Sequence, residues 1–354
     1  MNRRRFLQVV GSTSLLGAAR PGWAWLIAAP RRCRFVYIGA ADGIHVYSTT
    51  AGRRFTLQQT MASAYPVALA IGGGHLYVAN GISEHGNLLR GSVEAHAIDA
   101  ATGRLEFKNR VPLSLSGILP RDLAVAPDGR SVVVAVHGGG AYNVLSLHED
   151  GRLGSVSGIY KETGSGPQRA AHPSAVIFDA AGRVLTADEG SDRLSVFSLS
   201  GGQLTAAARR EVPAGSGPRG MVLHPDGNHL YVANALKGTV SSFAYAGGTL
   251  DHRQTVSVGT EVAALAMHPS GETLYTAHGH GVRVWKIAAD GGVEALPGLE
   301  GVQVSRLHVM PDGNSLLALS HDAVLGMKID ESGRVLAGPV KRASLSGPVS
   351  IAVI

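Results

Sequence analysis

The sequence has little of several residue types on which other folds depend. It contains one cysteine, Cys33, so no disulfide can form within the chain and cysteine pairing reveals no compartment. Charged residues make up only 16% of the chain and aromatic residues 5%, whereas glycine occurs 47 times. Few charges and many glycines fit strands that are buried on both faces and joined by tight turns, and they argue against a disordered chain.

Positive charge is concentrated at one end of the chain. The formal net charge is +6, but the first 34 residues carry seven arginines and no acidic residue, so removing these seven charges leaves −1. The remainder therefore lacks the basic stripe that neutralises nucleic-acid phosphates. We expect no nucleic-acid partner.

The basic end has the features of an export signal. The run Asn2-Arg3-Arg4-Arg5-Phe6-Leu7 resembles the twin-arginine (Tat) motif of bacteria. The apolar stretch from Val9 to Ala19 is too short and too rich in glycine and serine to remain as a membrane span. We predict a Tat-type signal in residues 1–29, cleaved after Ala24 or near Ala28, and a periplasmic or secreted protein. The alternative is a cytoplasmic protein with an accidental arginine cluster.

A repeated unit organises the rest of the chain, and its clearest copy runs from Val212 to Tyr245. An apolar run at 219–224 is followed by the turn Pro225-Asp226-Gly227, in which proline presets φ and glycine accepts a positive φ. A second strand, HLYVAN, covers 229–234, a third covers 240–245 and a fourth starts near 250. Four short antiparallel strands in about 45 residues is the period of a propeller blade.

The unit occurs seven times. Strands that align with HLYVAN lie at 35–40, 75–80, 131–136, 184–189, 229–234, 273–278 and 315–320. Apolar runs that align with 219–224 lie at 66–71, 121–126, 173–178, 219–224, 262–267, 304–309 and 349–354. The chain thus opens on a second strand and closes on a first strand, so its two ends would complete one blade and leave no exposed sheet edge. We predict one domain, residues 34–354, that is an all-β seven-bladed β-propeller with four-stranded antiparallel blades. A pair of β-sandwiches is the alternative.

One face of such a propeller is the place to look for function. If the first strands are innermost, the loops that lead into them and the loops that leave the second strands converge at one end of the axis. The two lengthened loops, 81–92 and 111–120, belong to this face. Its polar candidates are Arg121, Arg169, His172, Ser174, Arg219, Thr260, Glu261, Arg306, Asn80, His137, Asp188, Glu189, Asn234, His278, His280 and His321.

These candidates match no standard catalytic motif. Four histidines of this face come from different blades and lack tight ligand spacing, so we predict no metal site and no cofactor; they are His137, His278, His280 and His321. No G-x-S-x-G elbow is present, so a hydrolase triad has no support. Asp188 and Asn234 end second strands, where short polar side chains commonly close turns, or else they bind a ligand. His224 and His268 fall in turns of the opposite face, where we expect structural roles.

Two runs carry a family resemblance. AHPSAVIFDAAGRVLTADEGSDRLSVF (171–197) and VPAGSGPRGMVLHPDGNHLYVANALKGTVSSF (212–243) resemble the lactonase-type seven-bladed propellers, which include bacterial 6-phosphogluconolactonases and fungal carboxy-muconate lactonizing enzymes. The resemblance extends over the chain from residue 34 and is most specific over 171–245. It implies hydrolysis or formation of a lactone without a metal ion.

The resemblance also implies a site of four polar residues, of which this chain keeps one. Arg219 matches the arginine of the family's Gly-Pro-Arg-His motif. Ser174 replaces a histidine, Ala235 replaces a glutamate, and Thr260 stands close to the place of a second arginine. Neither serine nor alanine can take a proton from water at neutral pH, and losing a general base costs about 10²–10⁴ in rate.

Neighbouring residues offer replacements for the missing groups. His172 lies two residues before Ser174, and Glu189 is the counterpart of Ala235 one blade earlier. We therefore predict catalytic roles for His172 and Glu189. Binding of a small lactone or another anionic ligand is predicted for Arg219, Ser174, Asn234 and Arg121. The predicted function is an exported lactonase-type hydrolase with altered or lost activity, and the alternative is a non-catalytic ligand- or protein-binding propeller of the periplasm.

Overall fold

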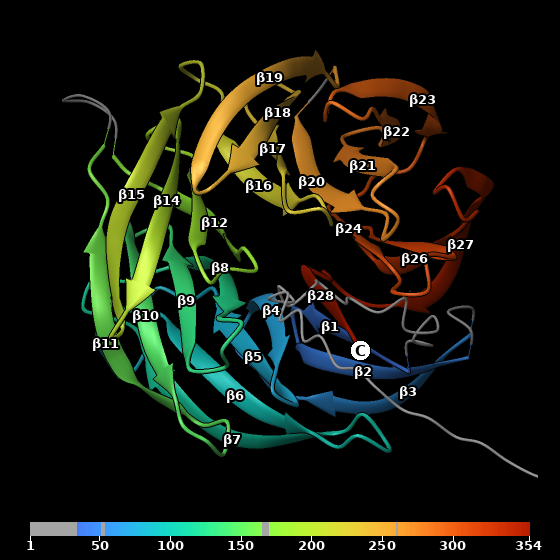
Figure 1. The fold of residues 1–354 in the computed structure, drawn as a ribbon. Coiled ribbons are helices and arrows are strands. Elements are labelled where there is room, and N and C mark those ends of the chain that lie inside the picture. The colour runs from blue at the N-terminus through green and yellow to red at the C-terminus, as the bar shows by residue number, and fades with distance from the viewer. Residues whose placement is uncertain (1–33, 51–53, 165–169, 260) are drawn as a thin grey trace, which may run out of the picture.

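The structure, a computed structural model, describes residues 34–50, 54–164, 170–259 and 261–354. In these residues it contains 28 strands and no helix, arranged as seven four-stranded antiparallel sheets around a central axis (Figure 1). The predicted seven-bladed β-propeller is therefore confirmed. The predicted signal segment, residues 1–29, and Cys33 lie outside the described residues.

Each blade has four strands, in the following order from the innermost to the outermost. Blade 1 consists of β28 (Ser350–Val353), β1 (Phe35–Ala40), β2 (Gly43–Thr50) and β3 (Arg54–Met61). Blade 2 consists of β4 (Pro66–Gly72), β5 (His75–Asn80), β6 (Ser92–Ile98) and β7 (Leu105–Pro112). Blade 3 consists of β8 (Pro120–Val125), β9 (Ser131–Val136), β10 (Ala141–Leu147) and β11 (Leu153–Lys161). Blade 4 consists of β12 (Pro173–Phe178), β13 (Val184–Asp188), β14 (Arg193–Ser200) and β15 (Gln203–Glu211).

The remaining three blades follow the same order. Blade 5 consists of β16 (Pro218–Leu223), β17 (His229–Asn234), β18 (Thr239–Ala246) and β19 (Thr249–Ser257). Blade 6 consists of β20 (Val262–Met267), β21 (Thr273–His278), β22 (Gly281–Ile287) and β23 (Val293–Glu300). Blade 7 consists of β24 (Arg306–Val309), β25 (Ser315–Leu319), β26 (Ala323–Ile329) and β27 (Val335–Ser344).

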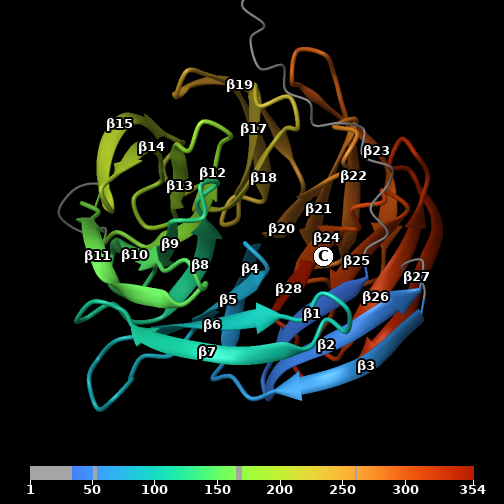
Figure 2. The same cartoon turned by 60° about the horizontal axis from the view of Figure 1, so that its bottom comes forward.

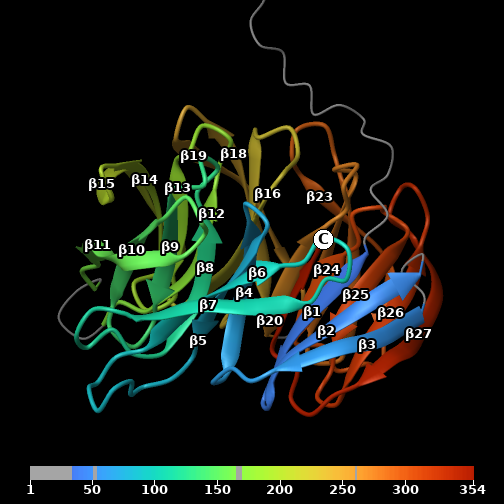
Figure 3. The ribbon, with the colours of Figure 1, turned by 90° about the horizontal axis from the view of Figure 1, so that it is seen from below.

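Burial follows the position of a strand within its blade. The second strands, such as β1 and β21, are buried along their whole length because they lie between the faces of two neighbouring blades. Their β-branched and aromatic residues suit a pleated surface that is covered on both sides. The outermost strands, such as β3 and β15, are mostly exposed. Figures 2 and 3 show the innermost strand β4 running along the axis and the outer strand β7 lying across it, as the twist of a sheet requires.

Buried tyrosines in the second strands connect successive blades. The Tyr77 hydroxyl of blade 2 donates a hydrogen bond of 3.0 Å to the Gly151 carbonyl of blade 3. Tyr37 and Tyr275 make the equivalent bonds to blades 2 and 7. Tyr231 has the same position in blade 5, but its buried hydroxyl has no partner among the described residues. In blades 1, 2 and 6 a polar contact therefore adds to the apolar packing against the next blade.

The two ends of the described chain close the ring, as the sequence predicted. β28 pairs with β1 in antiparallel register, from Val36 opposite Val353 to Gly39 opposite Ser350. The Ser350 hydroxyl also donates a hydrogen bond of 2.5 Å to the Pro66 carbonyl, which links blade 1 to blade 2. Closure therefore pairs the inner edge of β1, which a linear array would expose.

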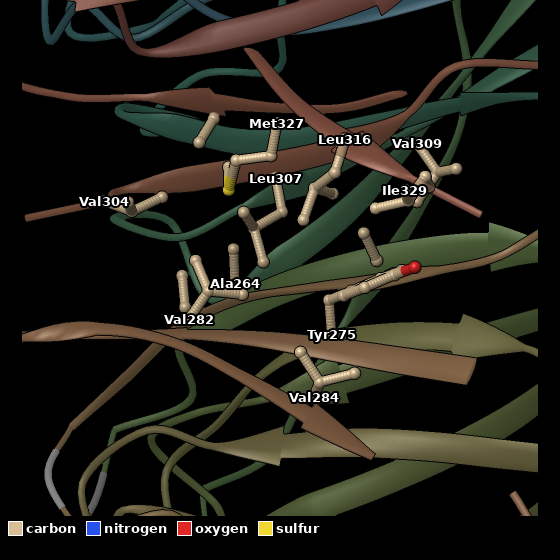
Figure 4. Close-up of a cluster of buried hydrophobic side chains, with 13 residues drawn as sticks. Ala264, Tyr275, Val282, Val284, Val304, Leu307, Val309, Leu316, Met327 and Ile329 are labelled. Atoms are coloured by element: carbon tan, nitrogen blue, oxygen red, sulfur yellow. The ribbon is translucent and has the colours of Figure 1, made fainter. Parts of the chain in front are cut away.

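The core consists of apolar layers between adjacent blades. Figure 4 shows one such layer, in which Ala264 and Tyr275 of blade 6 face Leu307, Leu316 and further apolar residues of blade 7. Burying one aliphatic or aromatic side chain of this size stabilises a fold by about 1.5–3 kcal/mol. Each blade contributes to two layers, so no blade can leave the ring without exposing both. Within the described residues there is no helix of the length and hydropathy needed to span a membrane.

The two lengthened loops lie together on one face. The Leu119 N–H donates to the Ile82 carbonyl at 3.0 Å, and the Gly91 N–H donates to the Gly117 carbonyl at 2.7 Å. A further bond, from the Gly138 N–H to the Ile118 carbonyl at 3.1 Å, joins this pair of loops to the loop that contains His137. The lengthened loops therefore form one hydrogen-bonded wall that joins blades 2 and 3, on the same face as the candidate site residues.

Candidate active site

Five of the innermost strands carry a β-bulge, that is, one extra residue, near their start at one end of the central axis. In β4, β8, β12, β16 and β20 the register with the second strand shifts between the first and third residues. Such a bulge bends a strand and re-aims the side chain of the extra residue. The residues at these five positions are Val67, Arg121, Ser174, Arg219 and Ala263. Three of the four predicted substrate-binding residues thus occupy equivalent places around the axis.

A cavity of about 210 Å³ lies on the axis below this ring. Every blade contributes to its lining through its innermost strand, so the cavity belongs to no single blade. Its polar lining consists of Arg121, Asp122, Ser174, Arg219, Arg306, His308 and Ser350. Its apolar lining includes Leu69, Met221, Leu265 and Ile351. A concave site of this kind, apolar with a few convergent polar groups, suits a small ligand that carries both ring carbons and charged or hydroxyl groups.

Arg219 is held at the cavity by two carboxylates. Glu189 accepts hydrogen bonds from its Nη2 at 2.7 Å and its Nε at 3.2 Å, and Glu261 accepts one from Nη1 at 2.6 Å. Burial opposes ionisation of Glu189, but the nearby His137 ring and the hydrogen bonds from Arg219 outweigh it and lower the pKa of Glu189 to about 2. Glu189 is therefore ionised at all ordinary pH values, and the guanidinium of Arg219 is fixed in orientation by a two-point contact.

A stacked pair of histidines supports this ion pair. The rings of His137 and His172 lie 4.7 Å apart with an angle of 20° between their planes. His137 Nε2 is 3.8 Å from Glu189 Oε2, and His172 Nδ1 is 3.2 Å from the His137 carbonyl. The two predicted catalytic residues, His172 and Glu189, are thus brought together with Arg219. Neither of them lines the cavity itself.

Two other arginines line the cavity, and neither is paired with a carboxylate in the part of the chain that the structure describes. Among the described residues, Arg121 donates no hydrogen bond, and Arg306 donates only to the neighbouring Ser305 carbonyl, at 3.2 Å. Burial lowers the pKa of both guanidinium groups, and repulsion from Arg219 adds to this effect, whereas Glu189 opposes it at Arg121 and Asp122 opposes it at Arg306. An anion placed between them would relieve this repulsion and accept the free N–H groups.

Asp122 and His308 are the titratable groups of the cavity lining besides the three arginines. Burial raises the pKa of Asp122 to about 6, although its Oδ2 accepts the Val176 N–H at 2.9 Å and its Oδ1 accepts its neighbour Leu123 N–H at 3.0 Å. Burial also lowers the pKa of His308 to about 4, so this imidazole is neutral at pH 7. A carboxylate with a pKa near neutrality inside a cavity is suited to accept a proton from a bound water molecule.

The other predicted binding residues differ in their position. The Ser174 hydroxyl lines the cavity but lies 2.7 Å from the Pro218 carbonyl and 3.0 Å from the Ala187 carbonyl, so its proton is used within the protein. Asn234 is buried inside blade 5, where its amide donates to the Ser241 hydroxyl at 2.8 Å, and it does not line the cavity.

Most of the wider candidates of this face serve the fold or lie beside the site. Asp188 closes its turn, because its Oδ1 accepts the N–H groups of Ser191 at 2.7 Å and His172 at 3.0 Å. Asn80 is buried and bonded to Ser92 at 2.9 Å. Arg169 and Thr260 lie outside the described residues. Three histidines of this face do not line the cavity; they are His278, His280 and His321.

Sequence reasoning missed Asp122, His308 and Tyr65. Asp122 and His308 sit inside apolar innermost strands, and a polar residue in an otherwise apolar strand was the available signal. Tyr65 precedes β4, has a positive φ of 51° and is half-exposed. A Cβ built on Gly81 would lie 3.0 Å from the Tyr65 ring and 2.4 Å from Val67, which lines the cavity, so Tyr65 lies beside the cavity mouth. A bulky residue with positive φ is uncommon and often marks a functional loop, but no sequence pattern indicates it at this position.

Comparison with known proteins relates this architecture to described families. A family model for "Lactonase, 7-bladed beta-propeller" matches residues 35–338. A 6-phosphogluconolactonase of Bacillus subtilis is 30% identical over 160 residues, which cover 44% of this chain and 45% of that protein. A 6-phosphogluconolactonase of Formosa agariphila is 28% identical over 222 residues, which cover 59% of this chain and 62% of that protein. The matched segments thus span less than two thirds of either relative.

A solved structure supports the likeness of fold. The periplasmic gluconolactonase of Pseudomonas aeruginosa superposes with a TM-score of 0.82 at 21% sequence identity, over 90% of this chain and 98% of that chain. At this identity the likeness concerns the propeller architecture alone.

Proposed function

This chain belongs to the family of seven-bladed β-propeller lactonases, and we propose that it hydrolyses a small sugar lactone in the axial cavity. One observation carries the proposal. The cavity combines Arg121 and Arg306, which form no ion pair with a carboxylate among the described residues, with Asp122, a carboxyl group whose pKa is about 6. Lactone hydrolysis needs a base for water and cationic groups for the developing oxyanion. The cavity offers both kinds of group.

In the proposed reaction Asp122 accepts a proton from a water molecule, whose oxygen attacks the carbonyl carbon of the lactone. The negative charge that develops on the carbonyl oxygen is stabilised by N–H groups of Arg121 and Arg306. When the tetrahedral intermediate collapses, the bond between the carbonyl carbon and the ring oxygen breaks. The proton passes from Asp122 to that oxygen, and the product is a hydroxy acid.

His172 and Glu189 remain the sequence-based candidates for the base, and the geometry favours Asp122 over them. Glu189 is paired with Arg219, has a pKa of about 2 and does not line the cavity. A group with so low a pKa is a weak proton acceptor. We propose that Glu189 positions Arg219 directly. His172 would help to position Glu189 through His137, on which it stacks.

We extend the proposal to an exported enzyme. The arginine-rich segment 1–29 supports it, and so does the structural likeness to a periplasmic gluconolactonase. A phosphorylated sugar lactone belongs to cytoplasmic metabolism, so we favour an unphosphorylated aldonolactone as the substrate. Tyr65 and the wall of loops 81–92 and 111–120 would border its path into the cavity.

The test is an assay of the purified mature protein with a panel of lactones that includes glucono-1,5-lactone and 6-phosphogluconolactone. We expect hydrolysis above the spontaneous rate, and a loss of about 10²–10⁴ in kcat for Asp122→Asn. Asp312→Asn is the matched control, because Asp312 closes a turn through its bond to the Asn314 N–H at 3.0 Å and does not line the cavity. Rates equal to the spontaneous reaction for every lactone would overturn the proposal.

A non-catalytic anion-binding propeller is the second candidate. It is favoured by Ala235, which is fully buried and apolar where the family resemblance implies a glutamate, and by the Ser174 hydroxyl, which is engaged by backbone carbonyls. If the protein binds gluconate with an affinity that Arg121→Ala weakens, yet hydrolyses no lactone, this second function holds and the first does not.

A further inference from the structure

Three side chains of types that can ligate a metal ion, His224, Asp226 and His229, lie together at the turn between β16 and β17, on the face opposite the cavity mouth. His224 Nδ1 is 2.8 Å from Asp226 Oδ1, and His229 Nδ1 is 3.2 Å from Asp226 Oδ2. One ligand atom from each residue can be chosen such that all lie within 4.8 Å of one another. Both imidazoles therefore present the same nitrogen to one carboxylate.

One hydrogen bond of His224 fixes the proton on one of its ring nitrogens. Its Nε2 is 3.0 Å from the Gly271 carbonyl, which can only accept, so Nε2 carries a proton. Its Nδ1 lies 3.2 Å from the Asp226 backbone nitrogen and 2.8 Å from Asp226 Oδ1, so this ring nitrogen faces a carboxylate oxygen. A contact of this kind is stable when a proton or a metal ion lies between the two atoms. An imidazole whose second nitrogen donates to a backbone carbonyl is the usual arrangement of a metal-ligating histidine.

Packing between blades 5 and 6 holds both rings in place. A Cβ built on Gly271 would lie 2.5 Å from His224 Nε2, and a Cβ built on Gly291 would lie 2.1 Å from His229 Cδ2. Both glycines have a positive φ, 79° and 82°, so their conformation also disfavours a side chain. The two rings therefore lie close against the backbone of blade 6, while Asp226 remains partly exposed, at 38%. The ligands are pre-oriented and reachable from solvent.

Comparison with blade 6 shows which residue of the cluster has a structural role. His268 occupies the place of His224, and its Nε2 lies 3.0 Å from the Gly313 carbonyl. In that turn Ser270 stands where blade 5 has Asp226, and Thr273 stands where it has His229. The bond between blades thus explains a histidine at position 224, as the sequence suggested. Asp226 also closes its turn, because its Oδ1 accepts the Asn228 N–H at 2.7 Å. Neither contact explains the second imidazole, His229, on the other oxygen of the same carboxylate.

We propose that His224, Asp226 and His229 bind a divalent transition-metal ion, with Zn²⁺ as the preferred ion. Two imidazoles and one carboxylate suit Zn²⁺, Co²⁺ or Ni²⁺, whereas Ca²⁺ and Mg²⁺ prefer oxygen ligands alone. Three protein ligands leave at least one coordination position open to water or to a further ligand. The ion would bind at the end of the innermost and second strands of blade 5 that is remote from the cavity, independently of lactone hydrolysis.

The experiment is a titration of the mature protein, prepared without a histidine tag and stripped with a chelator, with ZnCl₂ by calorimetry and with CoCl₂ by visible absorption. We expect one ion per chain. The double variant Asp226→Ser, His229→Thr copies the turn that blade 6 already carries and keeps the bond from His224 to Gly271. It should weaken binding by about 100-fold or more, because direct metal ligands matter at least as much as their supporting partners.

His75→Thr is the matched control, because His75 starts the second strand of blade 2 as His229 does in blade 5, and it should leave binding unchanged. Thermal unfolding of the variants without metal checks that they fold. If the double variant does not fold, the single Asp226→Ser is used. Equal affinity and stoichiometry in the wild type and the folded variant, or no binding by the wild type, would overturn the proposal.

Discussion

Glu189 accepts two hydrogen bonds from Arg219, with its carboxylate oxygens 2.7 Å from Nη2 and 3.2 Å from Nε. The two residues come from neighbouring blades, directly after β13 and at the start of β16. Their contact therefore fixes a cationic group at the cavity mouth and also joins blade 4 to blade 5. Glu189 therefore acts as a structural partner of Arg219, in contrast to a carboxylate that is left free for catalysis.

We expect Glu189→Gln to destabilise the protein and to impair ligand binding. It removes a charge that is mostly buried and leaves Arg219 with the exposed Glu261 as its partner. Hydrogen bonds to charged groups contribute about 1.5–3 kcal/mol, and a loss of that order in the free energy of unfolding should appear in urea denaturation. Glu106→Gln breaks an exposed pair with Lys108 and should have little effect. Equal stabilities of the two variants would contradict the structural role of Glu189.

The stabilisation by Glu189 should also depend on pH in a defined direction. Its pKa in the folded protein, about 2, is below the ordinary value of 4.5. A lowered pKa means that the stabilisation is fully present above pH 4.5 and is lost as the pH falls through 2. The difference in Tm between the wild type and Glu189→Gln should therefore shrink between pH 4.5 and pH 2, in scanning calorimetry. A constant difference over that range would argue against the low pKa.

Lactone hydrolysis should follow the ionisation of Asp122. Burial raises the pKa of this group to about 6, and only its ionised form can accept a proton from water. We expect kcat/KM to rise with pH through about 6 and to level off above it, after subtraction of the spontaneous reaction. Asp122→Asn should remove that step. A profile that instead follows a group titrating near the ordinary pKa of aspartate would exclude Asp122 as the base.

Arg121→Ala should weaken the binding of an anionic product such as gluconate. Arg121 lines the cavity and donates no hydrogen bond to another described residue, so its N–H groups are free for a ligand. Loss of a charge-assisted hydrogen bond corresponds to about a 10- to 100-fold rise in Kd, measurable by calorimetry. Arg130→Ala removes an exposed arginine of the opposite face and should leave Kd unchanged. A similar loss in both variants would point to long-range charge instead of a site.

The tyrosine links between blades can be tested with a matched pair. Tyr77→Phe removes a buried hydrogen bond to Gly151 and should lower the free energy of unfolding by about 0.5–1.5 kcal/mol. Tyr231→Phe removes a buried hydroxyl that has no partner among the described residues, so it should be neutral or slightly stabilising. Chemical denaturation of both variants gives the comparison, and equal losses would show that the hydroxyl bond contributes nothing.

The candidate site was only partly predictable from the sequence. The position of Arg219 in the repeat, and the family resemblance around it, placed it at the cavity, and the same positional argument placed Arg121 and Ser174. The role of Glu189 could not be predicted in the same way. Its side chain was a candidate base in the sequence, and its pairing with Arg219 became visible only when neighbouring blades were brought together. Asp122 looked like one polar residue in an apolar strand.

The sequence by itself determined the seven blades, their four strands and the closure by the last strand. These features follow from local patterns, namely β-forming runs, turns of the Pro-Asp-Gly type and a fixed period, each of which acts over a few residues. Only the tertiary structure decided which side chains meet. Arg121, Asp122, Arg219 and Arg306 come from three different blades and gather because the innermost strands surround one axis. The burial there, which raises the pKa of Asp122, is likewise a property of the closed ring and of no single segment.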